Sequence, residues 1–180
     1  MKKGKLMKIG LFIMLTVVLV FTSSISATST VPEVSRVQYF TVQNNNVCSA
    51  TDHHSIFYFN LNNISSVPVE MTVHFYNDVG DEITYAGSTG GSYGEYRPSS
   101  FIPGTPFSLN GKSTGHYYTG FGKNAILACN DIPAYGKIVI HSDTGLVMAN
   151  GEIRGVDLRS TVGYRMLTLT PISVNGGNPF

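Results

Sequence analysis

The sequence of 180 residues predicts an all-β fold, a single antiparallel β-sandwich of about nine or ten strands. Two observations lead to this prediction. Apolar and polar side chains alternate with a period of two in the central part of the chain, and turn-forming residues separate such runs at intervals of roughly 8 to 12 residues. A sheet with one apolar face needs a covering layer. Because no helical periodicity is present, a second sheet is the simplest cover.

The first 27 residues have the three parts of a secretory signal peptide. Four lysines lie within Met1–Lys8, the 13 residues of Ile9–Phe21 are almost wholly apolar, and Thr22–Ala27 is small and polar. The apolar run is shorter than the roughly 18 to 20 residues that a membrane span needs. We therefore expect cleavage after Ala27 and a secreted chain with no stable membrane span. An N-terminal anchor that is never cleaved is the alternative.

Cleavage changes the charge balance of the protein. Residues 1–27 hold four of the 12 basic residues and none of the 11 acidic ones, which leaves eight basic residues against eleven acidic ones and a net charge of −3. No basic run remains, so nucleic acid is not an expected partner. The remaining residues, 28–180, fit a single domain with one core.

Arg36–Gln43 alternates well enough to form the first strand, and it is the candidate edge strand for pairing with a neighbouring copy. The loop 44–54 follows and contains Cys48. The only other cysteine is Cys129. In an exported chain this pair is expected to form a disulfide, worth about 4 kcal/mol in the chain-entropy model. Two separately buried thiols are the alternative.

The central segment Ser55–Ala86 predicts three consecutive antiparallel strands joined by two hairpins. Phe57, Phe59 and Leu61 alternate with polar residues, and the same spacing of two recurs from Val69 to Phe75. The links, residues 62–66 and 77–80, are rich in Asn, Asp, Ser and Gly, which reverse a chain.

The excursion 87–104 interrupts all periodicity, because it is crowded with Gly, Ser and Pro. The remaining predicted strands follow it. Asn110-Gly111, a strong hairpin signal, separates the first two of them. In chain order they are Pro106–Asn110, Ser113–Phe121, Ala125–Cys129, Gly136–His141, Leu146–Arg154 and Thr161–Ile172.

The order of these pieces over residues 55–172 resembles the sensory rhodopsin transducer family and related bacterial β-sandwich domains. The resemblance rests on the run Val69–Tyr76 with the Gly80 turn, the strand at 107–109, and Gly136–Gly155. It implies a non-enzymatic sandwich that forms oligomers and binds a ligand or partner. Two features depart from the pattern, namely the export signal and the longer excursion, so no light-signalling role and no functional residue is carried over.

Two motifs point to an enzyme as the competing class. Gly90–Gly94 matches G-x-S-x-G, which would make Ser92 the nucleophile of a hydrolase, although the flanking residues lack the strand and helix of that motif. His53 and His54, next to Asp52, are the metal candidates. Adjacent residues of an extended chain point to opposite sides, so a shared ion needs a tight loop and a distant third ligand. The carboxylates show no pairing typical of glycoside hydrolysis.

The excursion also has the composition of a binding surface, because tyrosines lie among Gly and Ser. The predicted contact residues are Tyr93, Tyr96, Arg97 and Phe101, with Tyr117 and Tyr118 on the following strand. The sequence thus favours a secreted, non-enzymatic module at the bacterial surface that binds a glycan or protein, or assembles with copies of itself. No cofactor is expected, and a secreted hydrolase using Ser92 or a histidine-bound metal is the alternative.

Overall fold

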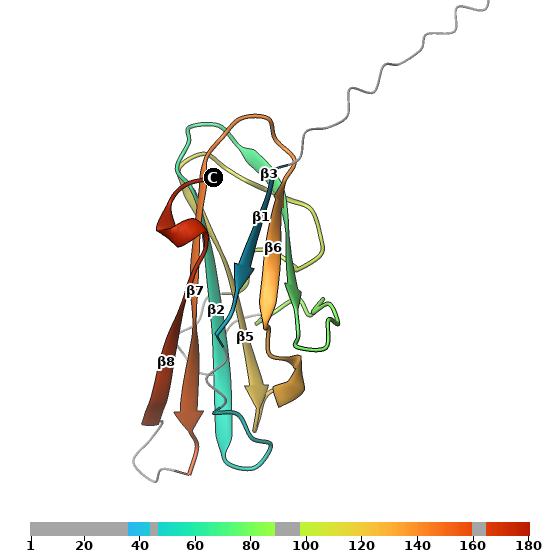
Figure 1. Ribbon diagram of the computed structural model, residues 1–180, viewed down its shortest axis with the longest axis vertical. Coiled ribbons are helices and arrows are strands. Elements are labelled where there is room, and N and C mark those ends of the chain that lie inside the picture. The colour runs from blue at the N-terminus through green and yellow to red at the C-terminus, as the bar shows by residue number, and fades with distance from the viewer. Residues whose placement is uncertain (1–35, 44–46, 89–97, 160–164) are drawn as a thin grey trace, which may run out of the picture. The chain divides into compact units, whose positions relative to one another are not determined.

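Two four-stranded antiparallel sheets pack face to face (Figure 1), which confirms the predicted all-β sandwich. The computed structural model describes residues 36–43, 47–88, 98–159 and 165–180. The predicted signal peptide lies outside these residues. They contain eight strands and two short 3₁₀ turns, η1 (Cys129–Asp131) and η2 (Asn175–Gly177). No helix in the described part of the chain is long and apolar enough to cross a membrane.

The strands are distributed over the sheets in a mixed order. In the first sheet the order is β1 (Arg36–Thr41), β6 (Tyr135–Ile140), β3 (Val69–Tyr76) and β4 (Phe107–Leu109). In the second sheet it is β5 (Ser113–Gly122), β2 (His53–Asn63), β7 (Val147–Asp157) and β8 (Arg165–Ser173).

The core lies between the sheets and is built on aromatic rings. Phe57 and Phe59 on β2 and Phe75 on β3 have no exposed surface. Phe75 meets both of the others edge to face, with ring centroids 5.0 and 5.2 Å apart, and Phe40 stacks on Phe59 at 4.9 Å. These are favoured aromatic geometries. The period of two in the central segment therefore aims its rings into one core, as predicted.

The hairpin predicted between β2 and β3 is wrong. β2 pairs with β5 and β7, whereas β3 pairs with β4 and β6, so the link between β2 and β3 crosses from one sheet to the other. The turn at Asn110-Gly111 and the turn at residues 142–145 also connect strands of different sheets. Each of these turns reverses the chain, but the reversed strand buries its apolar face by lying opposite its predecessor rather than beside it.

Two predicted strands are absent from the described residues. After the turn at Asn77, whose side chain accepts hydrogen bonds from the N–H groups of Val79 and Asp81, the chain makes a single bridge at Glu82. It then turns at Gly87, where φ is +81°, and its next residue bonds to β5 of the other sheet. Residues 125–129 fold into a closed loop instead of a strand, with the N–H of Gly122 donating to the carbonyl of Leu127.

Candidate functional site

The predicted contact residues of the excursion divide into two groups. Tyr93, Tyr96 and Arg97 lie outside the described residues, as does Ser92, the predicted nucleophile. Phe101 and Tyr117 lie in the core with 4% and 1% of their surfaces exposed, and the Tyr117 hydroxyl donates to the carbonyl of Tyr85.

Tyr118, the last of the predicted contact residues, is also buried. It packs with Ile56 and Val156 in a second apolar cluster. These three buried rings contribute stability rather than ligand contacts. Binding by Tyr93, Tyr96 and Arg97 of the excursion stays a prediction.

His53 and His54, the metal candidates, point to different environments on β2. His53 lies 3.4 Å from the guanidinium of Arg159, which also bonds the carboxylate of Asp157 and lowers its pKa to about 2. His54 is 9% exposed, and its Nδ1 donates to the carbonyl of Lys123 at 2.9 Å. Among the described residues no group of three or more His, Cys, Asp or Glu side chains is placed to hold a metal ion.

Burial makes His54 a source of pH dependence. Loss of hydration lowers the pKa of His54 from its ordinary value of 6.5, and the hydrogen bond to Lys123 opposes this only in part. The stability that His54 contributes is therefore complete above pH 6.5, and it is lost as the pH falls through the lowered pKa of the folded state. We expect urea unfolding to show a larger loss of stability between pH 7.5 and pH 5.5 in the wild type than in His54→Phe.

The matched control for this experiment is His53→Gln, because His53 is the adjacent and more exposed histidine. This variant should lose as much stability as the wild type over the same pH range. Equal pH dependence of the wild type and His54→Phe would contradict the account of His54.

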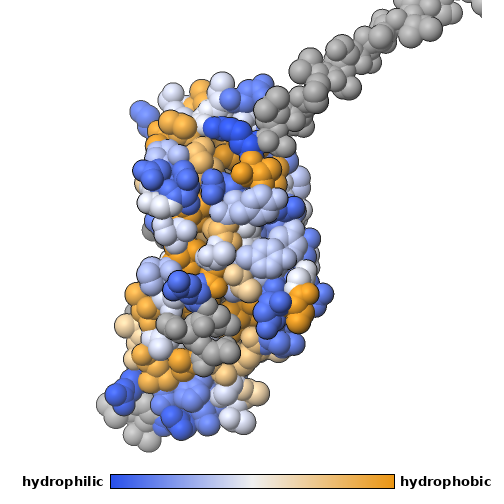
Figure 2. Space-filling view, in the orientation of Figure 1, coloured by the Kyte–Doolittle hydropathy of each residue, from blue (hydrophilic) through white to orange (hydrophobic). Residues whose placement is uncertain are grey.

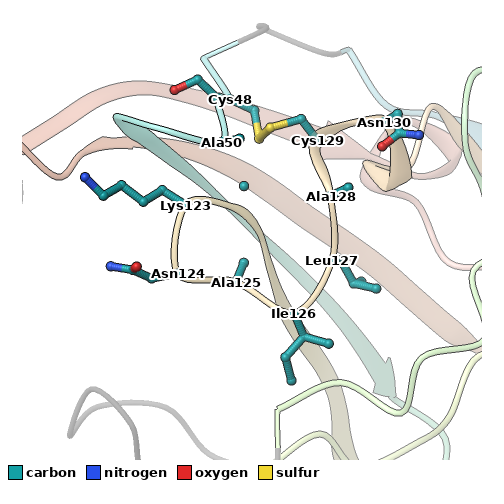
Figure 3. Close-up of a pocket in the computed structure, with 12 residues that line it drawn as sticks. Cys48, Ala50, Lys123, Asn124, Ala125, Ile126, Leu127, Ala128, Cys129 and Asn130 are labelled. Atoms are coloured by element: carbon teal, nitrogen blue, oxygen red, sulfur yellow. A yellow bond between two sulfur atoms is a disulfide. The ribbon is translucent and has the colours of Figure 1, made fainter.

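The disulfide between Cys48 and Cys129 is present, as predicted, with Cα atoms 5.6 Å apart. It borders a pocket of about 560 Å³ that is lined by residues 48–50 and by the loop 122–130 (Figure 3). In that view Lys123, Asn124 and Ile126 point away from the loop, and small side chains such as Ala125 and Ala128 remain around it. No charged group converges on a common point there, so the pocket lacks the polar anchors of a specific ligand site.

A more distinctive arrangement covers the outer face of the first sheet, which we call the tyrosine face. The strand register places Tyr39, Lys137 and His74 in one row across β1, β6 and β3. The next row contains Tyr135 and Tyr76. Since the core side chains of these strands point inward, the period of two directs this set outward.

The rings of the tyrosine face contact one another and remain accessible. The Tyr76 and Tyr135 rings stack with centroids 5.0 Å apart, and the ring of His74 lies parallel to that of Tyr76 at 6.2 Å. Tyr39 is 66% exposed and Tyr135 is 39% exposed. The rings lie next to one another rather than singly, which makes the face a candidate for molecular recognition.

Two polar groups accompany the rings. The ammonium group of Lys137 lies 5.9 Å from the centre of the Tyr76 ring, a distance at which a cation is attracted to the ring face. Nδ1 of His74 bonds the carboxylate of Glu82 at 2.6 Å, which fixes the orientation of the imidazole. The face thus offers aromatic surfaces, hydroxyl groups, a cation and an oriented imidazole within adjacent strands.

Sequence reasoning missed this face because its members come from three segments that are distant in the chain. Tyr76 belongs to the predicted strand of the central segment, and Tyr39 belongs to the first predicted strand. Their alternation with apolar residues marks both as outward-pointing. The alternation does not reveal that β6 lies between β1 and β3, and this neighbourhood is what gathers the rings.

No family model, no curated protein and no solved structure matches this chain. The resemblance to the sensory rhodopsin transducer family therefore stays a prediction, and the functional argument depends on the geometry of the chain itself.

Proposed function

We propose that the protein is a secreted, non-enzymatic binding module of the bacterial surface, and that it binds polysaccharide on the tyrosine face. The observation that carries the proposal is the set of exposed rings on adjacent strands, with Tyr39 and Tyr135 the most accessible. The disulfide between Cys48 and Cys129 supports the assignment to an oxidising compartment outside the cytoplasm.

The chemistry of the face suits a sugar. A pyranose ring presents polarised C–H groups on its faces, and the negative face of an aromatic ring attracts such groups. The hydroxyls around the sugar need donors and acceptors, which the tyrosine hydroxyls, Lys137 and the pair of His74 and Glu82 provide. A sheet surface extends over several strands, so it suits an extended chain better than a small molecule, which requires a concave pocket.

Affinity electrophoresis tests this proposal. Residues 28–180 are run through gels that contain soluble polysaccharides, such as hydroxyethyl cellulose, xylan, glycol chitin and mannan, and are mixed with insoluble peptidoglycan in a pull-down. We expect at least one of these to retain the protein, and we expect the double variant Tyr39→Ala/Tyr135→Ala to bind it about tenfold more weakly or worse. Each aromatic contact is worth roughly 0.5 to 1.5 kcal/mol, and 1.4 kcal/mol is a factor of ten.

The matched control removes exposed apolar side chains from other parts of the surface. Ile126 is 78% exposed and Ile102 is 44% exposed, so Ile102→Ala/Ile126→Ala should bind like the wild type. Far-UV circular dichroism checks that all variants fold. Retention that is equal in the tyrosine variant and the wild type, or the absence of retention by every polysaccharide, would overturn the proposal.

A further inference from the structure

The residues that follow β8 form a tight turn around η2 on the surface of the domain. Asn175, Gly176 and Gly177 all have positive φ angles, of 50°, 60° and 82°. Glycine adopts such angles without strain, and asparagine tolerates them better than most other residues do. η2 is drawn in red near residue 180 in Figure 1, and Figure 2 shows a hydrophilic surface at the same position. The turn therefore has a left-handed conformation and is open to solvent.

Side-chain amides hold this turn closed. The Nδ2 group of Asn175 donates to the carbonyls of Asn178 and Pro179 at 3.3 and 3.2 Å. The Nδ2 group of Asn178 donates back to the carbonyl of Asn175 at 3.2 Å. We call these three bonds the amide clasp. Directly after it, Phe180 and Val147 exchange two backbone hydrogen bonds of 3.0 and 3.1 Å. The clasp thus keeps residue 180 beside β7.

Asn175 also begins one of three Asn-Gly dipeptides in the sequence, and the other two begin at Asn110 and Asn150. In such a dipeptide the backbone nitrogen of the glycine attacks the side-chain carbonyl of the asparagine, because the glycine has no side chain that restricts backbone rotation. This reaction contributes to the thermal lability of asparagine. In a folded protein it requires a local movement of the backbone, so it is fastest where the chain opens most easily.

The dipeptide at Asn150 is restrained by the sheet. Asn150 lies in β7, which pairs with β2 on one side and with β8 on the other. Its side-chain carbonyl accepts a hydrogen bond from Asn60. A Cβ atom on Gly151 would collide with the carbonyl of Tyr58, so the backbone is closely packed there. Central strands of this kind open only at a free energy near that of global unfolding.

The dipeptide at Asn110 lies in a turn, but that turn is packed against another part of the chain. The carbonyl of Asn110 accepts hydrogen bonds from the side chains of Asn63 and Ser113, at 3.1 and 2.6 Å. A Cβ atom on Gly111 would collide with the backbone of Ser66. Movement of this backbone therefore has to break long-range contacts.

The dipeptide at Asn175 has no comparable restraint. A Cβ atom on Gly176 would meet only the side chain of Asn178, at 3.6 Å, and one on Gly177 would meet no atom of the described residues within 4 Å. Asn175, Gly176 and Gly177 are all exposed. The two bonds that Asn175 donates are longer than most N–H to O hydrogen bonds, and both go to residues of the same turn.

We propose that Asn175 is the site at which the folded protein deamidates, and that deamidation opens the amide clasp. The backbone nitrogen of Gly176 forms a bond to Cγ of Asn175, and Nδ2 leaves as ammonia, which carries away the proton of that nitrogen. Water then opens the cyclic imide at one of its two carbonyl carbons, which gives aspartate or isoaspartate. The sequence of steps needs no oxidant, metal or enzyme.

Neither product is able to keep the clasp closed. An ionised carboxylate has only acceptors, so it loses both bonds to the carbonyls of Asn178 and Pro179 and faces their oxygens instead. Isoaspartate also adds a methylene group to the main chain within the turn. We therefore expect the reaction to release residue 180 from β7. The tyrosine face belongs to the other sheet, so this change does not depend on the proposed saccharide binding.

Peptide mapping of the folded chain, residues 28–180, during incubation at pH 8 and 37 °C tests the site. Trypsin cuts after Lys112 and Arg154 and thereby separates the three dipeptides, and mass spectrometry detects the exchange of an amide for a hydroxyl. Asn175 should deamidate roughly tenfold faster than Asn110 and Asn150, or more, because its turn opens more easily. In concentrated urea the three sites should react at similar rates. Reaction of the folded chain at Asn110 or Asn150 as fast as at Asn175 overturns the proposal.

Hydrogen exchange measured by NMR tests the consequence for the clasp. Asn175→Asp reproduces one product, and the amide protons of Phe180 and Val147 should then exchange roughly tenfold faster than in the wild type, since their bonds to each other are lost. The matched control is Asn124→Asp, because Asn124 is also exposed, with a φ angle of 60°, and lies in a different loop. Exchange at the rate of the wild type in Asn175→Asp, or equally fast exchange in Asn124→Asp, overturns the role given to the clasp.

Discussion

Replacing both Cys48 and Cys129 by alanine lowers the free energy of unfolding by about 4 to 5 kcal/mol, the largest effect expected from any change in this protein. The disulfide closes a segment of 81 residues, and the chain-entropy model gives this magnitude for a loop of that length. The bond also ties the loop before β2 to the loop that contains Lys123, whose carbonyl accepts the hydrogen bond from His54. Without the disulfide, these two loops at one end of the sandwich are no longer tied to each other.

Urea unfolding under oxidising conditions measures this effect, with the reduced wild type as the matched comparison. Reductant should destabilise the wild type to the level of the cysteine-free variant, and it should leave that variant unchanged. A variant that unfolds at the same urea concentration as the oxidised wild type would contradict the role given to the disulfide.

Phe59→Ala is expected to cost about 3 to 5 kcal/mol, the range observed when a buried aromatic ring is removed. Phe59 has no exposed surface, and its ring contacts those of Phe40, Phe57 and Phe75, which belong to both sheets. The neighbouring rings are themselves constrained by packing, so the cavity is not expected to collapse.

Val79→Ala is the control for the core variant, because Val79 lies in a turn and is 76% exposed. Its unfolding free energy should stay within about 0.5 kcal/mol of the wild type. If Phe59→Ala were destabilised no more than Val79→Ala, the aromatic cluster would not be the main support of the sandwich.

Local sequence patterns predict the strands of this protein but not their partners. The alternation around Phe57, Phe59 and Phe75 correctly indicates strands with one buried face. The turn residues at 62–66 and at Asn110-Gly111 correctly indicate chain reversals. Turn chemistry describes only the direction of the chain, however, and a reversed strand can lie beside its predecessor or across the core from it. The hairpins predicted at 62–66 and at Asn110-Gly111 are wrong for this reason.

Asn63 provides a long-range contact at two of these links, where the reversed strand lies across the core instead of beside its predecessor. Its side chain is 1% exposed and donates to the carbonyls of Val67, Leu109 and Asn110. One amide thereby joins the link after β2 to the turn after β4 at the same end of the sandwich. A buried polar group that is satisfied by residues 46 positions away leaves no signal in the local pattern.

The candidate site was harder to predict than the fold. Composition drew attention to the excursion 87–104 and to Tyr117, yet composition does not distinguish a tyrosine that fills the core from one that faces a ligand. Tyr39, Tyr76 and Tyr135 become a site only through the strand order β1, β6, β3. That order results from long-range pairing, which a single sequence does not specify.

The most direct measurement of the central claim is an NMR titration of residues 28–180 with an oligosaccharide of whichever polysaccharide retains the protein. We expect the amide shifts that change with ligand to lie in β1, β3 and β6, at and around Tyr39, Tyr76 and Lys137, and to saturate with one affinity. Shifts confined to the loop 122–130 or to the second sheet would place the ligand elsewhere and contradict the assignment of binding to the tyrosine face.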